Sequence, residues 1–235
     1  MEIRKKLVDP SKYGTKCPYT MNPEFITIHN TYNDATAENE IAYMIRNNNE
    51  VSFHVAVDDK EAVQGIPLER NAWHCGDGGG NGNRKSIGVE ICYSLSGGDR
   101  YYKAENNAAV VVAGLMKQYN IPISKVRTHQ SWSGKYCPHR MLDEGRWNSF
   151  IERVQNAYNG AGSSTPPSNN GVGVVTITAD VLRVRTGPGT NYRIVKNVYR
   201  GERYQSWGIQ NGWYNVGGDQ WVSGEYVRFS NFSEA

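Results

Sequence analysis

The chain has 235 residues, a length that suits two domains better than a single one. Hydrophobic residues make up 38% and charged residues 21%, a balance that excludes disorder throughout the chain. A net charge of +3 is too small to indicate a nucleic-acid-binding protein. The longest apolar run, residues 108–116, is far shorter than the roughly 20 residues of a membrane span. No secretory signal is visible at the N-terminus, so we expect a protein made in the cytoplasm and not inserted in a membrane.

The first part of the chain alternates strand and helix patterns. Strands are predicted at residues 25–31, 52–59, 86–93 and 126–130, and helices at 35–48, 103–120 and 144–159. Thr36 is the expected N-cap of the first helix. The strongest helical stripe consists of Ala108, Val111, Val112, Leu115, Met116 and Tyr119. This alternation predicts an α/β domain over residues 1–158, with helices on both faces of a sheet.

A change of composition divides the chain. Residues 159–171 read NGAGSSTPPSNNG and contain no charge and no large apolar side chain, so we predict a linker there. Residues 172–235 show no helical period and consist of short strand patterns separated by turn residues. They predict a second domain, a small all-β barrel.

Three side chains are candidate metal ligands. His29 ends the strand at 25–31, His129 ends the strand at 126–130, and Cys137 follows in the segment THQSWSGKYCPHR, whose Pro and Gly argue against a helix. Strand ends are where sites form in open α/β sheets. Two imidazoles and a thiolate suit Zn²⁺, and three protein ligands leave a fourth position open, as in catalytic sites. Spacing alone leaves structural histidines and an inert thiol as the alternative.

Two charged residues are candidates for proton transfer and charge stabilisation. Glu90 stands between apolar neighbours in the strand at 86–93, where a cation nearby would tune it as a proton carrier. Its alternative is an ordinary pair with Arg84 or Lys85. Lys135 could stabilise a developing oxyanion, and its alternative is a solvated loop lysine. The four cysteines include no CxxC pair, so we expect free or metal-bound thiols rather than disulfides.

Five stretches in a fixed order carry a family resemblance: ITIHNT, VSFHVAVDD, IPLERNAWHCGDG, SIGVEICY and VRTHQSWSGKYCPHR. With them, residues 1–158 resemble the zinc-dependent N-acetylmuramoyl-L-alanine amidases of the type-2 amidase family, which share a fold with peptidoglycan recognition proteins. The domain closely resembles the amidases of Bacillus phage endolysins. This resemblance implies a central mixed β-sheet flanked by helices and hydrolysis of the amide bond between N-acetylmuramic acid and L-alanine.

The resemblance implies a role for each candidate residue. His29, His129 and Cys137 match the ligands of one Zn²⁺ ion. Glu90 matches the glutamate that acts as a base or positions the attacking water. Lys135 matches the lysine that stabilises the transition state.

The chain departs from some family members at Phe53, where they have a tyrosine that assists the water. More of the proton transfer is then expected of Glu90. His54 is expected to lie behind the ligands or in the core. Trp73 and His74 are expected to line the substrate groove, although both could equally be scaffold.

Residues 172–230 resemble bacterial SH3-like (SH3b) domains, through LRVRTGPGTNYRIV, GERY and GWYNVGGDQWVSGEYV. Such domains bind cell walls, so the expected partner is the peptidoglycan of a Gram-positive, Bacillus-type wall. We expect the protein to be a monomer. Some aromatic side chains are candidates for wall contact and others must fill the barrel: Tyr192, Trp207, Trp213, Tyr214 and Trp221.

The resemblance also predicts where the protein acts. A phage or prophage endolysin would wait in the host cytoplasm until its release to the wall. Two alternatives stay open, a bacterial autolysin of the same chemistry and a non-catalytic peptidoglycan-binding protein. The presence of Cys137 beside both histidines favours the enzyme, because non-catalytic relatives typically lack that ligand. A proline-peptide adaptor or a stem peptidase fits the sequence less well, since no HExxH motif is present.

Overall fold

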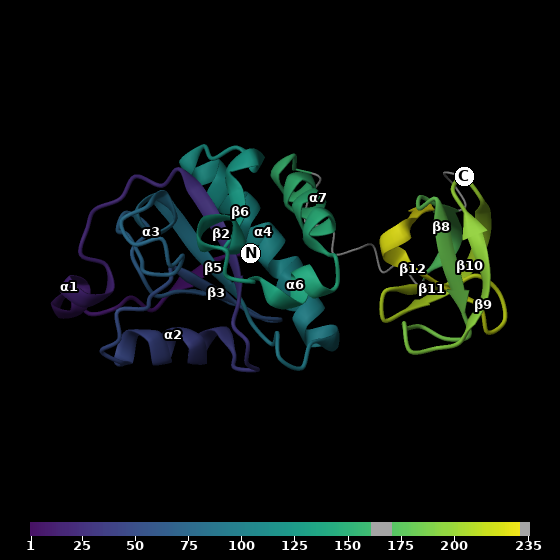
Figure 1. Cartoon of the computed structure of the whole chain (residues 1–235), viewed down its shortest axis with the longest axis horizontal. Helices are drawn as coiled ribbons and strands as arrows, with labels where there is room; N and C mark the ends of the chain where they lie inside the picture. Colours follow the sequence, from purple (N-terminus) through teal and green to yellow (C-terminus); the bar gives the residue numbers. More distant parts are fainter. Residues whose placement is uncertain (161–170, 231–235) are drawn as a thin grey trace. The chain divides into compact units, whose positions relative to one another are not determined.

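The computed structural model describes residues 1–160 and 171–230 (Figure 1). The chain divides into two compact units, Met1–Ser163 and Ser164–Ala235, and each is described by itself. Most of the predicted linker, 159–171, lies outside the described residues. Among the helices that are described, none has the length and apolar character needed to cross a bilayer.

The N-terminal unit is built on a six-stranded mixed sheet with the strand order β1-β4-β3-β5-β2-β6. In that order the strands are Ile3–Lys5, Ala62–Gln64, Val55–Val57, Ser86–Ile91, Phe25–Asn30 and Val126–Thr128. β3 and β4 pair antiparallel, whereas the other neighbours pair parallel. Strands β2 and β5 each have a neighbour on both sides and are almost continuously buried, which explains their apolar sequences.

Helices flank this sheet, as predicted (Figure 1). Helix α2 (Ala37–Arg46) contacts β3 and β4, and α4 (Gly98–Tyr119) contacts β5 and is covered by α7 (Trp147–Tyr158). Thr36 caps α2 by accepting a hydrogen bond from Asn39 N. The short helices are α1 (Tyr13–Lys16), α3 (Asn81–Lys85), α5 (Gln130–Ser133), α6 (His139–Asp143) and the 3₁₀ turns Pro10–Lys12 and Ile123–Lys125.

The predicted stripe of α4 faces the core. Its members from Ala108 to Met116 are buried, and Tyr119 packs at the margin. The helix begins at Gly98, earlier than predicted. The prediction missed this start because the Gly-Gly-Asp sequence there carries no helical signal. Tyr101 in the first turn is nevertheless completely buried. Phe150 and Val154 of α7 complete the core on the outer side of α4.

The prediction that residues 128–140 contain no helix is wrong in part. One helical turn, α5, follows His129 directly, and α6 begins at His139. Gly134 ends α5 in the left-handed region with a φ of 78°. The glycine therefore terminates a short helix rather than preventing one.

A buried carboxylate ties the two long helices together. Glu105 on α4 is fully buried and accepts hydrogen bonds from Arg146, at 2.9 to 3.3 Å, and from Arg153 on α7. Burial alone would raise the pKa of Glu105, but the charges and hydrogen bonds of the two arginines outweigh it and hold the pKa below its usual value.

Glu105→Gln is expected to lower the free energy of unfolding by about 3 kcal/mol near neutral pH, since two arginines lose their charged partner. The folded pKa lies below the unfolded value of about 4.3, so this stabilisation is present above about pH 4.3 and is lost as the pH falls through the folded pKa. Denaturant unfolding from about pH 7 down to about pH 2 measures it. A wild-type advantage that does not shrink with falling pH would contradict the assignment.

The C-terminal unit is a seven-stranded antiparallel sheet with the order β13-β7-β10-β11-β12-β8-β9 (Figure 1). From β7 to β13 its strands are Val172–Ile177, Val181–Arg185, Ile194–Tyr199, Arg203–Gln210, Trp213–Asn215, Trp221–Ser223 and Val227–Ser230. A 3₁₀ turn, Gly224–Tyr226, precedes β13. Its core consists of Val175, Ile177, Leu182, Val184, Val198 and Val222. The all-β prediction for this part is confirmed.

The candidate wall-contact aromatics of this unit differ in exposure. Trp207 is 60% exposed and Tyr192 is 42% exposed. Trp213 and Trp221 are partly buried. Tyr214 packs against the core and stacks on Phe229, with ring centroids 5.3 Å apart. Of this set, Trp207 offers the largest free surface to a ligand.

Candidate functional site

Neighbouring parallel strands bring the predicted site residues together. The register of β2 and β5 pairs His29 with Glu90, so both side chains project from the same face of the sheet. β6 lies on the other side of β2 and ends at Thr128. His129 follows it, and its backbone N–H donates to the Ile28 carbonyl at 3.3 Å. The common carboxyl edge of three strands therefore carries both histidines and the glutamate.

The side chains of the three predicted ligands come together at this edge. His29 Nδ1 lies 3.1 Å from His129 Nδ1 and 3.8 Å from Cys137 Sγ. The three ligand atoms lie within 4.8 Å of one another, and all three side chains are buried. All four cysteines of the chain are free, so the Cys137 thiol is not used in a disulfide. The expectation of free thiols is confirmed.

The chemistry of this donor set fits a zinc ion. Burial, with the neighbouring histidines and Lys135, lowers the pKa of His29 well below its usual value, and burial also lowers the pKa of His129. These shifts favour neutral rings, which can give a nitrogen lone pair to a metal. A dication between them would satisfy the two facing nitrogens. Burial raises the pKa of Cys137 to about 12, and coordination would favour its thiolate. Two imidazoles and one thiolate are a ligand set that Zn²⁺ accepts.

Glu90 lies beside the three ligand atoms. Its Oε1 is 4.0 Å from His29 Nδ1, and its side chain is 17% exposed. Burial raises the pKa of Glu90 to about 8, Glu40 adds to the rise, and Lys135 opposes it. Within the described residues, Glu90 Oε2 is buried and has no hydrogen-bond partner, which leaves it free for water or substrate. This is the environment of a group that exchanges protons near neutral pH.

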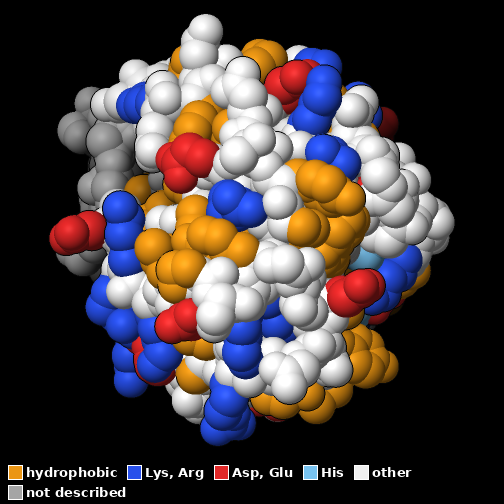
Figure 2. Space-filling model, turned by 90° about the vertical axis from the view of Figure 1, so that its left-hand side faces the viewer, with side chains coloured by type: hydrophobic (Ala, Val, Ile, Leu, Met, Phe, Trp, Pro, Cys, Tyr) orange, Lys and Arg blue, Asp and Glu red, His pale blue; other side chains and the backbone are white. Residues whose placement is uncertain are grey.

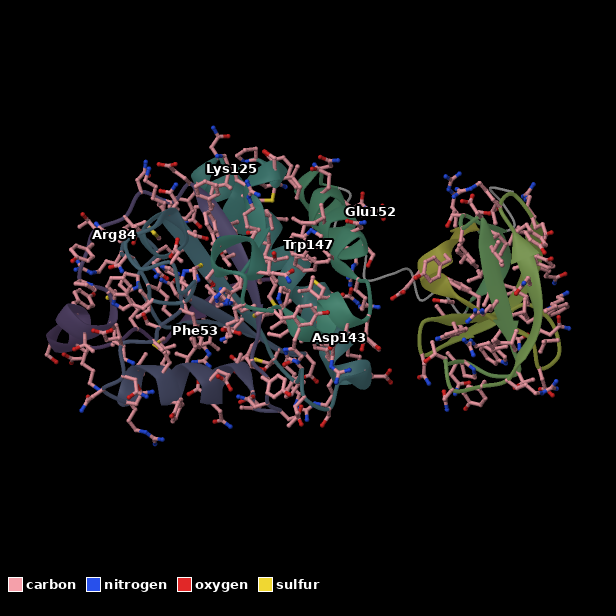
Figure 3. The ribbon with its side chains drawn as sticks, viewed as in Figure 1. Phe53, Arg84, Lys125, Asp143, Trp147 and Glu152 are labelled. Atoms are coloured by element: carbon pink, nitrogen blue, oxygen red, sulfur yellow. The ribbon has the colours of Figure 1, made fainter. Side chains whose placement is uncertain are left out.

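The alternative in which Glu90 pairs with Arg84 or Lys85 is wrong. Lys85 pairs with Glu24 at 2.9 Å. Arg84, labelled on α3 in Figure 3, stacks over the Tyr19 ring at 3.7 Å from its centroid. The cation that does act on Glu90 is Lys135, which is exposed in the loop before Cys137. Its charge also influences His29, His129 and Cys137.

Phe53 and His54 lie in the interior. Phe53, labelled in Figure 3, is buried, and its side chain has no atom that could form a hydrogen bond at the site. His54 Nδ1 accepts from Gly88 N and His54 Nε2 donates to the Arg70 carbonyl, both at 2.9 Å. Both nitrogens are therefore used by the backbone, and His54 is a core residue.

Trp73 and His74 occupy different surroundings. Trp73 is partly buried, donates from Nε1 to the Thr15 carbonyl at 3.2 Å and packs edge-on against Tyr19. His74 is only 8% exposed, and its Nδ1 lies 2.9 Å from His29 Nε2. Their predicted contact with substrate stays a prediction, and most of the His74 surface faces protein.

Sequence reasoning overlooked a second cluster and its support. His29, His74 and Cys75 form another buried group of potential ligand atoms. The Asp77 carboxylate accepts from Gly82 N and Asn83 N at 2.7 and 3.0 Å. Asn83 Oδ1 in turn accepts from His74 N and Cys75 N at 2.9 and 2.8 Å. An aspartate before a glycine-rich run at a helix start was the signal for this support.

Exposed aromatic and apolar side chains accompany the segments that supply the site. Tyr32 follows β2, Leu95 follows β5 and Tyr136 precedes Cys137, and all three are more than half exposed. The Tyr32 ring packs edge-on against His139, with centroids 4.6 Å apart. Figure 2 shows the face on the left-hand side of Figure 1, where hydrophobic patches lie between Lys and Arg side chains.

Two family models match the chain. Residues 19–140 match the N-acetylmuramoyl-L-alanine amidase model, and residues 180–228 match the bacterial SH3 domain model. The first match includes all three candidate ligands, Glu90 and Lys135. The chain belongs to the N-acetylmuramoyl-L-alanine amidase family. Below, the N-terminal unit is called the amidase domain and the C-terminal unit the SH3 domain.

Similar proteins support the amidase assignment. The amidase CwlA of a Bacillus species is 63% identical over 157 residues, covering 66% of this chain and 62% of its own length. CwlA of Bacillus subtilis strain 168 is 50% identical over 206 residues, covering 86% of this chain and 76% of its own. The structure of PlyL is 80% identical with a TM-score of 0.65, covering 66% of this chain and 97% of PlyL. The chain thus spans less than two thirds of the first relative.

Proposed function

We propose that this amidase-family chain hydrolyses the amide bond between N-acetylmuramic acid and L-alanine in bacterial peptidoglycan, with one Zn²⁺ held by His29, His129 and Cys137. The observation that carries the proposal is the meeting of two imidazole nitrogens and a thiol beside a partly buried glutamate. When bound, Zn²⁺ would polarise the scissile carbonyl and lower the pKa of a water molecule beside it.

Glu90 takes the proton of the attacking water and later returns it to the amine of the leaving L-alanine. Its Oε1 lies 4.0 Å from His29 Nδ1, and this proximity to a proposed ligand supports the role. A cation held nearby favours its carboxylate form, whereas burial favours the acid form. The balance of these two effects suits a group that must both accept and donate a proton.

Lys135 binds the oxygen on which negative charge develops. The side chain is exposed, and its charge acts on Glu90 and on all three proposed ligands. A cation fixed at the point where an oxyanion forms stabilises the transition state more than the substrate. Because the ligands, Glu90 and Lys135 all come from one chain, we propose that a monomer acts.

Digestion of purified peptidoglycan with product identification tests this function. The expected products are stem peptides with a new L-alanine amino terminus and intact glycan strands, and a chelator should abolish their formation. Cleavage within the stem would indicate a peptidase, and binding without cleavage would indicate a recognition protein. Because curated relatives come from Bacillus, we propose a Gram-positive, Bacillus-type wall as the substrate.

We also propose that the SH3 domain holds the enzyme on the wall through exposed aromatic side chains. Trp207 is the candidate with the largest exposed fraction, 60%. Trp207→Ala is expected to weaken binding to washed walls about 10-fold or more, the effect of losing an aromatic anchor. Co-sedimentation measures this best in a Glu90→Gln background, in which the walls should stay intact.

A matched exposed aromatic of the same domain serves as the control. Tyr199 on β9 is 53% exposed and is not among the candidate contacts. Tyr199→Ala should bind walls as the parent chain does. Undiminished sedimentation of the Trp207 variant would remove that residue from the proposed binding surface.

A further inference from the structure

A second histidine stands directly behind the proposed metal site. The His74 ring meets the His29 ring edge-on, at 5.1 Å between centroids and an interplanar angle of 77°. His29 presents Nδ1 to His129 and Cys137, and its Nε2 lies 2.9 Å from His74 Nδ1. His74 Nε2 continues the chain of contacts to the Ser86 carbonyl at 3.2 Å. One line of hydrogen bonds thus leads from the backbone of β5 to a metal ligand.

The end of this line fixes the proton on each ring. A carbonyl oxygen can only accept, so His74 Nε2 carries the hydrogen that it donates to Ser86. In a neutral imidazole the other nitrogen is then an acceptor, which makes His74 Nδ1 the acceptor for His29. His29 Nε2 therefore carries the hydrogen of that ring, and His29 Nδ1 keeps its lone pair. That lone pair faces the two other proposed ligands.

One neighbouring group also reaches His74 Nδ1. Cys75 Sγ lies 3.1 Å from it and 3.7 Å from Thr27 Oγ1. A thiol hydrogen directed at Nδ1 would leave that nitrogen an acceptor, so the contact does not alter its role toward His29. His29 is 2% exposed and His74 is 8% exposed, so bulk water has little access to either ring. The hydrogen bond between the histidines is therefore the one that decides the His29 tautomer.

The sequence around His74 builds a tight seat for its ring. A Cβ atom at Gly88, on β5, would lie 2.9 Å from ring atoms of His74. A Cβ at Gly82 would lie 2.6 Å from Cys75 Cβ. Asn83 Oδ1 holds the backbone N–H groups of His74 and Cys75 from the other side. Two glycines and one asparagine thus place the acceptor nitrogen opposite His29.

We propose that His74 is a positioning residue, which holds His29 in the tautomer whose Nδ1 lone pair faces the metal. This inference rests on the metal site of the proposed function and assigns to His74 a task other than contact with substrate. Partners of this kind fix both the orientation and the tautomer of ligating histidines, and their loss typically costs about 10- to 100-fold in metal affinity.

The tautomer can be measured directly in the metal-free wild-type chain. Nitrogen-15 NMR of the histidine rings distinguishes protonated from unprotonated nitrogens. The expected result is a His29 ring with hydrogen on Nε2 and a His74 ring also with hydrogen on Nε2. A His29 ring that carries its hydrogen on Nδ1 in the metal-free chain would overturn the proposal without touching the proposed function.

Two substitutions of His74 distinguish the effect of losing its hydrogen-bond acceptor from the effect of losing the imidazole ring. His74→Asn keeps an oxygen near the position of Nδ1, whereas His74→Gln keeps a donor near Nε2 and loses the acceptor for His29. Zinc affinity, measured by competition with a chromophoric chelator, should fall about 10- to 100-fold in the glutamine variant and be largely rescued in the asparagine variant. The glutamine variant should also show a mixed His29 tautomer. Equal losses in both variants, or no loss in either, would overturn the proposal.

A further measurement separates this proposal from its rivals. Zinc titration of the wild type should end at one ion per chain. Uptake of a second ion would show that His74 and Cys75 act as ligands and would overturn the positioning role. Failure of the wild type to bind any zinc would instead contradict the proposed function, while the ring measurements would still report on the tautomer.

Discussion

Cys137→Ser is expected to lose zinc and amidase activity together. The Cys137 sulfur lies 3.8 Å from His29 Nδ1. It is the thiol of the proposed ligand group, and the other two members are histidines. A hydroxyl is a much poorer ligand for zinc than a thiolate, and removal of a direct ligand should cost more than the roughly 100-fold that loss of an outer partner costs. Zinc content after dialysis and release of stem peptides from purified walls measure the two effects.

The matched control for this variant is another buried free cysteine. Cys17 is fully buried in the core of the amidase domain and belongs to neither group of potential ligand atoms. Cys17→Ser should lower stability while zinc content and the activity of the folded fraction stay near those of the wild type. A Cys137→Ser chain that keeps its zinc, or that loses zinc and still digests walls at the normal rate, would contradict the assignment.

Glu90→Gln is expected to keep zinc and to lose about 10² to 10⁴ in turnover, the usual contribution of a positioned proton carrier. Glutamine has nearly the same shape but cannot take a proton from water. Because Glu90 is close to the ligands without being one of them, the metal should remain bound. The kcat for amide hydrolysis and the zinc content of the same preparation give the answer.

An exposed glutamate of the same domain provides the comparison. Glu152 lies on α7, away from the labelled Phe53 and Arg84 (Figure 3), and its side chain faces solvent. Glu152→Gln should keep wild-type kcat. Full activity of the Glu90 variant would remove this carboxylate from the mechanism, and loss of zinc from it would make Glu90 a ligand rather than a proton carrier.

Four strands of the amidase domain were predictable from the sequence, whereas β1, β4 and the neighbours of each strand were not. Apolar runs that end in His29 and His129 predict two strands with polar ends, and a third predicted strand carries Glu90 between apolar neighbours. No local pattern states that β5 and β6 both flank β2. That order is set by long-range packing, and it makes His29 and Glu90 register partners. The family motifs supplied the grouping of ligands that spacing alone left open.

His74 shows why some roles escape a sequence pattern. The family resemblance implies that His74 lines the substrate groove, with a scaffold role as the alternative. Its burial depends on Gly88, which lies on a neighbouring strand and leaves the space for the ring. Its hydrogen-bond partners, His29 and the Ser86 carbonyl, come from two other strands. These relations exist only after the sheet has formed.

X-ray absorption spectroscopy at the zinc edge is the most direct test of the proposed metal site. For the purified wild-type chain we expect one zinc with two imidazole nitrogens at about 2.0–2.1 Å and a single sulfur at about 2.3 Å. The Cys137→Ser chain should lack the sulfur contribution in whatever zinc it retains. A site with two sulfurs, or with nitrogen and oxygen ligands alone, would contradict a centre built from His29, His129 and Cys137.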